Sequence, residues 1–407
     1  MPARILTMAE IIQMAREKAV LSANNLDVLA GLFESPQYSD LLFGGDLEFD
    51  EMAMAPAVGG EPFDEARYLE VQRRVERNFA GPKGTALSLP CERVRDAVLL
   101  VAQQRRYHPV REFLSGLKWD GVPRIASVLE EILGVEPTEL SQAMMRAWFI
   151  SAVARPMKPG CKVDHVLILV GPQSLGKSQF FVELAGAKWF SDSVIDIQNR
   201  DSYLLMRRVW ILEWSELEAM QRARHQDAVK AFITSAVDIY RAPYARSTES
   251  VPRTSIIVGT TNDASFLSDP SGNRRYWPIG VKREVNLRRL REWGDLLWAE
   301  AVVAYNAGEK WWLTPAMEEQ LSEQQGEFEQ IDPWTEPVLG AAANRSGLDE
   351  DLTTAYLLTQ GLDKPKGQWS RADEMRVGAI MRKAGWHKRR VRVGTRLVYL
   401  WERGETT

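Results

Sequence analysis

The sequence predicts an α/β fold with a largely parallel sheet in the central part of the chain. Three short apolar runs, at 165–170, 208–213 and 255–261, alternate there with helix-like stretches. Strands separated by helices are typical of a three-layer α/β domain, because a crossover between parallel strands needs a connection of helix length. The chain has 407 residues, which at roughly 150 residues per domain suggests two or three folded units.

The residues before this domain, 1–105, predict an α-helical region that could act as an oligomerisation collar. Apolar residues recur at helical spacing in 8–21, 64–79 and 91–105. The stretch 53–62 contains proline and glycine and predicts a loop between helices. We therefore expect the front of the chain to be mostly helical.

The residues after the central domain predict a linker and a small separate unit. Residues 314–346 include an acidic, glutamine-rich stretch and are assigned to the linker. In the unit 347–407, helical patterns cover 352–360 and 371–384, and 389–401 predicts a strand, a glycine-containing turn and a second strand. Two helices followed by a hairpin are typical of a winged helix.

The net charge of −4 conceals a strong asymmetry along the chain. Residues 364–403 hold twelve Lys or Arg against three acids, a local charge of +9 that leaves −13 for the rest. This basic end predicts a nucleic-acid partner, with sequence read by the 371–384 helix and phosphates held by the following strand. A basic surface hairpin without nucleic acid is the alternative. The predicted phosphate contacts are Lys388, Arg389, Arg390 and Arg392.

Several classes of protein are excluded by composition. Two Cys cannot build a disulfide framework or a four-cysteine zinc site, and the four His are scattered. The longest apolar runs fall far short of the ~20 residues that span a bilayer. The sequence start shows no secretory signal, so we expect a protein of a reducing, cytoplasmic setting.

A complete G-x-x-x-x-G-K-[ST] motif follows the first apolar run and precedes a helix-like segment. Backbone N–H groups of such a loop converge on phosphate oxygens, the lysine adds positive charge, and the final hydroxyl binds Mg²⁺. The motif therefore predicts ATP and Mg²⁺ as ligands, with a chance glycine-rich turn as the alternative. It consists of Gly171, Pro172, Gln173, Ser174, Leu175, Gly176, Lys177 and Ser178.

Two carboxylates accompany the second apolar run. Glu213 ends that run, 36 residues after Lys177, and Glu216 follows three positions later. One carboxylate at this edge can hold Mg²⁺ with Ser178, and a second can polarise the attacking water. The sequence leaves open which of the two is the base, and Glu216 could instead cap a helix.

The third run adds an amide and is followed by two arginines. Asn262 directly follows this run and can orient the attacking water beside the γ-phosphate, although asparagine is also a common turn former. Arg274 and Arg275 are candidates for an arginine finger, with a surface ion pair as the alternative. A finger supplied to a neighbour would require a ring or stack of subunits.

Between the second and third runs, 238–253 predicts a hairpin with a polar tip. Basic side chains interleaved with an aromatic ring suit a single nucleic-acid strand, since charge follows the phosphates and rings stack on bases. A solvated hairpin with no ligand is the alternative. The predicted DNA-binding residues here are Arg241, Tyr244, Arg246 and Arg253.

Five strings together resemble the virulence-associated protein E family, which is carried by phages, prophages and satellite elements. The ATPase core of that family is similar to superfamily 3 helicases and D5-type primase-helicases. The string LKWDGVPR is specific to this family. The strings are YHPVREFLSGLKWDGVPRI (107–125), PGCKVDHVLILVGPQSLGKS (159–178), VWILEWSEL (209–217), VGTTN (258–262) and GNRRYWPI (272–279).

The resemblance implies a helicase-type, AAA+-like P-loop ATPase domain over 106–313 that assembles into a ring, with a hexamer as the expected form. By position it assigns Lys177 and Ser178 to the phosphate loop, Asn262 to the sensor, and the hairpin to DNA contact inside the pore. The acidic motif falls on Glu213 with Glu216, and the finger on Arg274 or Arg275. The chain shows no primase module, so priming would come from a separate protein.

Three functions are compatible with these features. The leading hypothesis is an ATP-dependent helicase or translocase that acts on single-stranded or forked DNA during replication of a mobile element, with duplex contacts through the basic end. The alternative is a DNA-binding replication initiator or regulator whose nucleotide site only switches assembly. A role in element defence or DNA packaging is the third.

Overall fold

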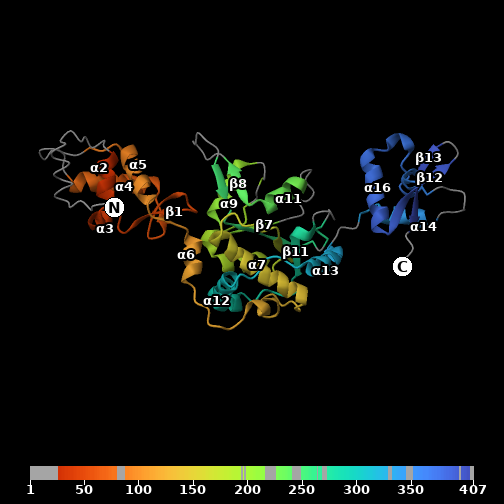
Figure 1. Cartoon of the computed structure of the whole chain (residues 1–407), viewed down its shortest axis with the longest axis horizontal. Helices are drawn as coiled ribbons and strands as arrows, with labels where there is room; N and C mark the ends of the chain where they lie inside the picture. Colours follow the sequence, from red (N-terminus) through yellow and green to blue (C-terminus); the bar gives the residue numbers. More distant parts are fainter. Residues whose placement is uncertain are drawn as a thin grey trace. The chain divides into compact units, whose positions relative to one another are not determined.

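The computed structural model describes residues 26–79, 88–193, 196, 199–215, 226–240, 249–263, 265–267, 273–328, 332–344, 352–393 and 396–403. The chain divides into two compact units, Met1–Phe328 and Glu329–Thr407 (Figure 1). Among the helices in those ranges, none combines the length and apolar character needed to cross a bilayer.

The front of the first unit contains the helices predicted at 64–79 and 91–105, and it adds a small sheet that the expectation of an α-helical region did not include; the predicted helix at 8–21 lies outside the described residues. A small sheet has the strand order β3-β2-β1-β4, in which β1 pairs antiparallel with β2 and parallel with β4. The predicted loop 53–62 contains β2 and β3, because β1 supplies the backbone partners that a proline- and glycine-containing stretch cannot indicate by itself. The elements are α2 (Leu26–Phe33), α3 (Pro36–Leu42), β1 (Leu47–Asp50), β2 (Ala55–Val58), β3 (Glu61–Pro62), α4 (Glu65–Asn78), α5 (Cys91–Ala102) and β4 (Arg106–Tyr107).

The centre of the first unit is a five-stranded sheet with the order β11-β5-β10-β7-β6, and every neighbouring pair is parallel. The three predicted strands are confirmed as β5, β7 and β10, and the sheet adds β6 and β11. Because the strands are parallel, their carboxyl ends share one edge, where α/β sheets bind ligands. The strands are β5 (Val166–Val170), β6 (Phe190–Ser191), β7 (Ile211–Ser215), β10 (Ile256–Thr261) and β11 (Tyr276–Gly280).

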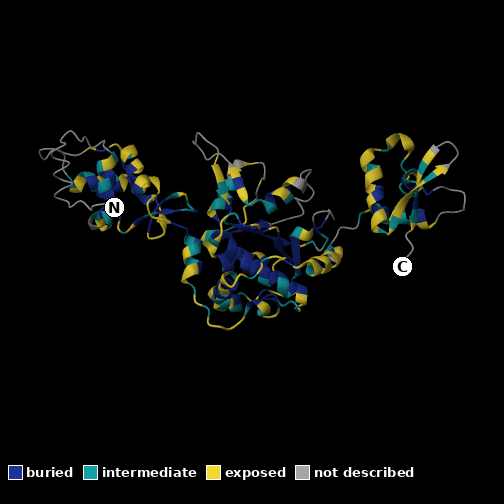
Figure 2. Cartoon of the chain, in the orientation of Figure 1, coloured by how far each residue is buried: buried dark blue, intermediate teal, exposed yellow. Residues whose placement is uncertain are grey.

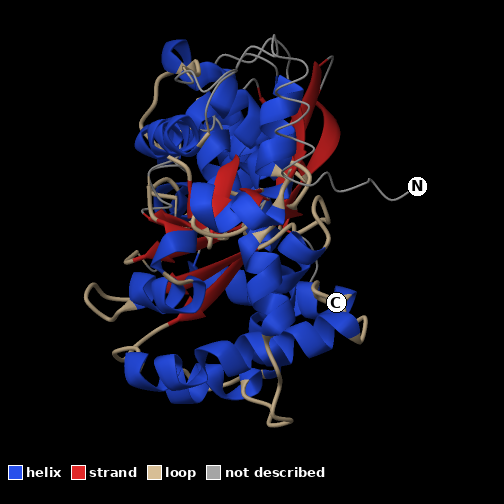
Figure 3. Cartoon of the chain, turned by 90° about the vertical axis from the view of Figure 1, so that its left-hand side faces the viewer, coloured by secondary structure: helices blue, strands red, loops and turns tan. Residues whose placement is uncertain are grey.

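Helices cover both faces of this sheet, as the three-layer expectation requires (Figure 3). Along β5, Leu167 and Leu169 join the apolar cluster of one face, and the alternate residues Val166 and Ile168 join that of the other. The sheet is accordingly buried from both sides (Figure 2). The first face packs on α7 (Glu139–Met157), α8 (Lys177–Ala185) and α12 (Leu287–Asn306), and the second on α9 (Arg200–Arg208) and α11 (Gln226–Thr234).

The family-specific string LKWDGVPR is a structural element rather than part of the pocket. Buried Glu300 of α12 accepts hydrogen bonds from the backbone N–H groups of Arg124 (2.6 Å) and Ile125 (3.0 Å). Arg146 of α7 pairs with the same carboxylate at 3.1 Å. The string follows α6 (Pro109–Gly116) and leads through a 3-10 turn (Ile125–Ser127) into a π-helical turn (Val128–Ile132).

The expected linker 314–346 instead contains helices that belong to one unit or the other. Leu321 of α13 (Pro315–Gln325) lies in the core of the first unit. Val338 of α14 (Thr335–Ala343) lies in the core of the second. The boundary therefore falls between Phe328 and Glu329. Each helix joins a core through its few apolar residues, and the polar composition of the stretch does not reveal this packing.

The second unit combines short helices with one antiparallel hairpin, in line with the predicted helices and strands. Its core joins α14 and α16 to Trp401 of the hairpin. A capping box between Ser370 and Asp373 fixes the start of α16. The winged-helix assignment stays a prediction. The remaining elements are α15 (Thr354–Tyr356), a π-helical turn (Leu357–Gly361), α16 (Arg371–Lys383), β12 (Trp386–Val393) and β13 (Arg396–Arg403).

Candidate nucleotide-binding site

The G-x-x-x-x-G-K-[ST] motif forms the turn between β5 and α8, at the carboxyl edge of the sheet. A Cβ on Gly171 would lie 2.1 Å from the carbonyl oxygen of Val281, so only glycine fits there. Gly176 has a φ of 81° and caps the start of α8, another conformation that favours glycine. The loop is held from both sides, since Gly171 N–H donates to Thr261 O and Val285 N–H donates to Leu175 O.

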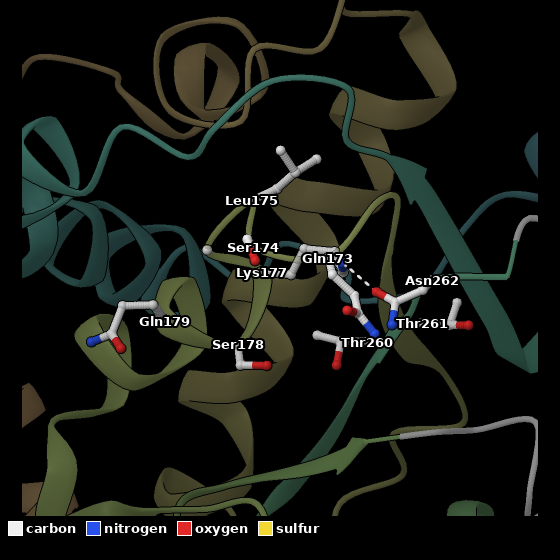
Figure 4. A pocket seen from close by; sticks show the side chains of 10 residues that line it. Gln173, Ser174, Leu175, Lys177, Ser178, Gln179, Thr260, Thr261 and Asn262 are labelled. Carbon is white, nitrogen blue, oxygen red and sulfur yellow. Dashed lines mark hydrogen bonds between the residues drawn. The ribbon is translucent and has the colours of Figure 1, made fainter.

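A pocket of about 660 Å³ opens over this loop (Figure 4). Its size lies within the ~300–1,000 Å³ range of small-ligand sites. The backbone N–H groups at the start of α8 point toward an anion placed in such a pocket, and the helix dipole adds partial positive charge. The lining residues are Gln173, Ser174, Leu175, Gly176, Lys177, Ser178, Gln179, Thr260, Thr261 and Asn262.

Lys177 is 7% exposed, and its ammonium has three acceptors. Nζ donates to the carbonyls of Gly171 and Pro172, each at 2.7 Å, and to Oδ1 of Asn262 at 2.9 Å (Figure 4). Burial lowers the pKa of Lys177 below its usual value, while the charge of Glu213 raises it. The structure therefore brings together the lysine and the asparagine that the sequence placed 85 residues apart.

Glu213 lies beneath the loop and is 1% exposed. Its Oε1 accepts hydrogen bonds from Ser178 Oγ at 2.7 Å and from Thr260 Oγ1 at 2.5 Å. Its Oε2 is buried and has no hydrogen-bond partner among the described residues. A serine hydroxyl next to a carboxylate with an unused oxygen fits the oxygen ligands that Mg²⁺ prefers, so the residues present suit a magnesium ion at this position.

Thr260 is a site residue that sequence reasoning missed. In the register of β10 with β7, Val258 stands opposite Glu213, and Thr260 is two residues further on the same face. The sequence does show a polar residue, Thr260, near the end of a mostly apolar strand. Recognising it required the strand pairing.

Arg274 and Arg275 do not reach the pocket of their own chain. They form a 3-10 turn directly before β11, whose first residue Tyr276 pairs with Val166 and whose last pairs with Val170. The phosphate loop begins after Val170, at the other end of this pairing. The arginines therefore lie at the opposite edge of the sheet, and the length of strand between them and the level of the loop is about 16 Å at ~3.3 Å per residue. Within the described chain, Arg275 Nε is buried without a hydrogen-bond partner, while Arg274 is exposed.

Arg253 is not available to DNA, which corrects its assignment as a DNA-binding residue. It follows the hairpin of β8 (Val237–Tyr240) and β9 (Glu249–Pro252) and is 3% exposed. Its Nε donates to Oδ2 of Asp238 at 3.0 Å, Nη2 donates to Oδ1, and Nη1 donates to Phe232 O at 2.7 Å. The guanidinium thus ties the hairpin base to α11. The predicted site residues Glu216, Arg241, Tyr244 and Arg246 lie outside the described residues.

The buried pair of Arg253 and Asp238 makes a stability prediction. Asp238→Ala is expected to lower the free energy of unfolding by about 3–5 kcal/mol, because it leaves an uncompensated buried charge. Urea denaturation followed by tryptophan fluorescence measures this loss. The matched control is Asp295→Ala on the exposed side of α12, with an expected change under about 0.5 kcal/mol. Equal losses for the two variants would contradict the prediction.

A parallel sheet, a glycine-rich loop between β5 and α8, and a hydroxyl–carboxylate pair beneath the loop define a P-loop domain of the nucleoside triphosphatase type. The match of residues 114–330 to the virulence-associated protein E-like domain then identifies the family. This match covers more than half of the chain, and the chain belongs to the virulence-associated protein E-like family, as the five strings predicted.

Similar solved structures include two of the NrS-1 C-terminal region, both without ligand. An A-form structure is 13% identical with a TM-score of 0.49, covering 91% of this chain and 100% of the other. A second is 15% identical with a TM-score of 0.48, covering 90% and 98%. A RuvB mutant from Thermotoga maritima is 13% identical with a TM-score of 0.23, covering 66% and 95%. No curated protein sequence matches the chain.

Proposed function

We propose that this protein is an ATP-dependent helicase or translocase that acts on single-stranded or forked DNA in the replication of a phage, prophage or satellite element. Membership of the virulence-associated protein E-like family supports the setting. The observation that supports ATP hydrolysis most directly is that Lys177, Ser178 and Glu213 lie together at the phosphate loop. These groups match those that P-loop ATPases use to position ATP.

In the proposed reaction, the chain's own groups position ATP and stabilise the charge that develops on its γ-phosphate. The loop N–H groups hold the phosphates, and Lys177 exchanges its carbonyl partners for phosphate oxygens. Ser178 and Glu213 would hold Mg²⁺, which when bound neutralises phosphate charge. Asn262 orients the attacking water. Because Glu213 already accepts two hydroxyl hydrogen bonds, we assign the role of base to Glu216.

The position of the two arginines supports assembly into a ring. Arg274 and Arg275 lie at the edge of the sheet opposite to their own phosphate loop, so an arginine finger at these positions would act in the site of a neighbouring subunit. A head-to-tail ring supplies such a neighbour to every subunit, and a hexamer is the proposed form. Arg241, Tyr244 and Arg246 of the predicted hairpin are proposed to contact the strand in the central channel, and a separate primase would supply primers.

Lys177→Ala tests the function directly. In the wild type, single-stranded DNA is expected to stimulate ATP hydrolysis and a forked duplex to be unwound. The variant is expected to lose at least about 100-fold in hydrolysis, because a positive charge at the phosphates is removed. Lys188→Ala, an exposed lysine shortly after α8, is the matched control and should keep full activity.

Two results decide between the helicase and the alternatives. If single-stranded DNA fails to stimulate hydrolysis and Lys177→Ala leaves unwinding intact, the helicase proposal is wrong. ATP-dependent assembly on DNA without strand separation would instead indicate a nucleotide-switched initiator.

A further inference from the structure

The hairpin β12–β13 of the second unit has two chemically different faces. Residues directly opposite each other in an antiparallel pair share a face, and alternate residues face opposite sides. The register therefore divides the basic residues that the sequence grouped together. Arg389 and Glu402 stand on one face and form an ion pair at 2.8 Å. The other, here called the cationic face, consists of the cross-strand pairs Trp386–Arg403, Lys388–Trp401, Arg390–Tyr399 and Arg392–Leu397.

The cationic face carries only positive charge. None of its cross-strand pairs contains an acid, and the single carboxylate of the two strands, Glu402, belongs to the opposite face. Among the described residues, neither Arg390 nor Arg392 forms an ion pair with a carboxylate, although Lys364 and Arg376 of the same unit do. A set of arginines left without internal partners is complementary to an anionic ligand.

Large apolar side chains stand exposed among these charges. At the base of the hairpin, Trp401 is 2% exposed and lies in the core of the unit, donating Nε1–H to Thr354 Oγ1. Further along the same face, Tyr399 is 54% exposed and Leu397 is 56% exposed. The base of the cationic face is therefore packed into the core of the unit, and the part further along the hairpin is exposed to solvent. In this exposed part, Arg390 and Tyr399 are cross-strand partners on the same face.

We propose that the outer half of the cationic face binds single-stranded DNA. Tyr399 provides a ring on which a base stacks, while Arg390 and Arg392 hold the neighbouring phosphates. An exposed ring beside arginines that have no carboxylate partner among the described residues suits a strand whose bases are unpaired, because the π-face of a base is hidden within a duplex. The inference adds a second DNA-binding site to the proposed function, and it rests on that function only for where the single-stranded DNA comes from. It removes Arg389 from the predicted phosphate contacts.

Binding of a labelled oligothymidylate to the full chain, without nucleotide, tests the proposal. Tyr399→Ala is expected to raise Kd about tenfold, the low end of the value of one base stacked on an aromatic ring. Arg390→Gln with Arg392→Gln should reduce the slope of log K against log salt by about 1.4, at about 0.7 per phosphate contact. With 5-bromouracil in the oligonucleotide, irradiation should give an adduct at Tyr399.

Arg389→Gln is the matched control, since it removes the same charge from the opposite face. It should change Kd by less than about twofold, because a screened charge contributes little without direct contact. Equal weakening by Arg389→Gln and Arg390→Gln, or an unchanged Kd for Tyr399→Ala, would overturn the proposal. So would a duplex of the same sequence that binds as tightly and responds equally to Tyr399→Ala.

The same measurements separate this inference from the ATPase proposal. Lys177→Ala should bind the oligonucleotide with the wild-type Kd and the same dependence on Tyr399. If that dependence holds while ATP hydrolysis is absent from the wild type, the cationic face stands and only the helicase proposal fails. If DNA stimulates hydrolysis but Tyr399→Ala leaves the Kd for the oligonucleotide unchanged, the helicase proposal stands and the cationic-face proposal fails.

Discussion

Replacing Arg274 or Arg275 by Ala is expected to reduce ATP hydrolysis by about 10³-fold or more while leaving ATP binding near the wild-type level. The expected size is that of an arginine finger, which neutralises charge that appears only in the transition state. Both side chains lie at the far edge of the sheet from their own phosphate loop. The deficiency should therefore arise in the site of the neighbouring subunit.

Mixing variants tests this arrangement. A subunit with Lys177→Ala keeps both arginines, and a subunit with Arg275→Ala keeps its phosphate loop. Mixed assemblies should contain complete interfaces and recover part of the hydrolysis that each variant lacks alone. Arg288→Ala, at a residue whose side chain is 91% exposed on α12, is the control and should behave as the wild type. Co-assembly without any recovery would contradict a shared site.

Glu213→Gln is expected to lower hydrolysis by about 10²–10³-fold with little loss of ATP binding. The substitution keeps the shape of the side chain but removes the charge that faces Ser178 and Thr260. Without that charge the site loses its proposed hold on Mg²⁺, so the Mg²⁺ concentration at half-maximal hydrolysis should rise. Steady-state hydrolysis over a magnesium titration provides the measurement.

Glu183→Gln on α8 is the matched control for this prediction, because it makes the same chemical change at a residue that does not line the pocket. Glu183 pairs with Arg291 instead. The control should retain hydrolysis within about threefold of the wild type, since partly exposed ion pairs contribute little. Hydrolysis by Glu213→Gln at the level of this control would show that the buried carboxylate is not part of the reaction.

The sequence predicted the parts of the site whose chemistry is local. The phosphate loop is a contiguous motif, so its spacing predicted both the positions and the roles of Gly171, Lys177 and Ser178. The strands β5, β7 and β10 were found because buried parallel strands are short and almost wholly apolar. Lys177 and Asn262 were both predicted, but their contact of 2.9 Å follows from β10 pairing beside β5.

Charged residues were the least predictable, because the same guanidinium serves a nucleic acid or an internal carboxylate. Arg253 was predicted to bind DNA, and the register of the hairpin buries it against Asp238. In the second unit, Arg389 and Arg390 are adjacent in sequence, yet only Arg389 pairs with Glu402 among the residues that the structure describes. Cross-strand pairing decides these outcomes, and a basic run alone carries no information about it.

By itself, the sequence determined that this protein is a P-loop α/β chain of the virulence-associated protein E-like family with a basic end. These features depend on neighbouring residues or on apolar periodicity. Only the tertiary structure decided which strands are adjacent, that the N-terminal region contains a sheet, and that Arg274 and Arg275 lie at the opposite edge of the sheet from their own loop. The reason is physical. Strand partners such as β5 and β11 lie more than a hundred residues apart, and their pairing is set by packing of the whole sheet.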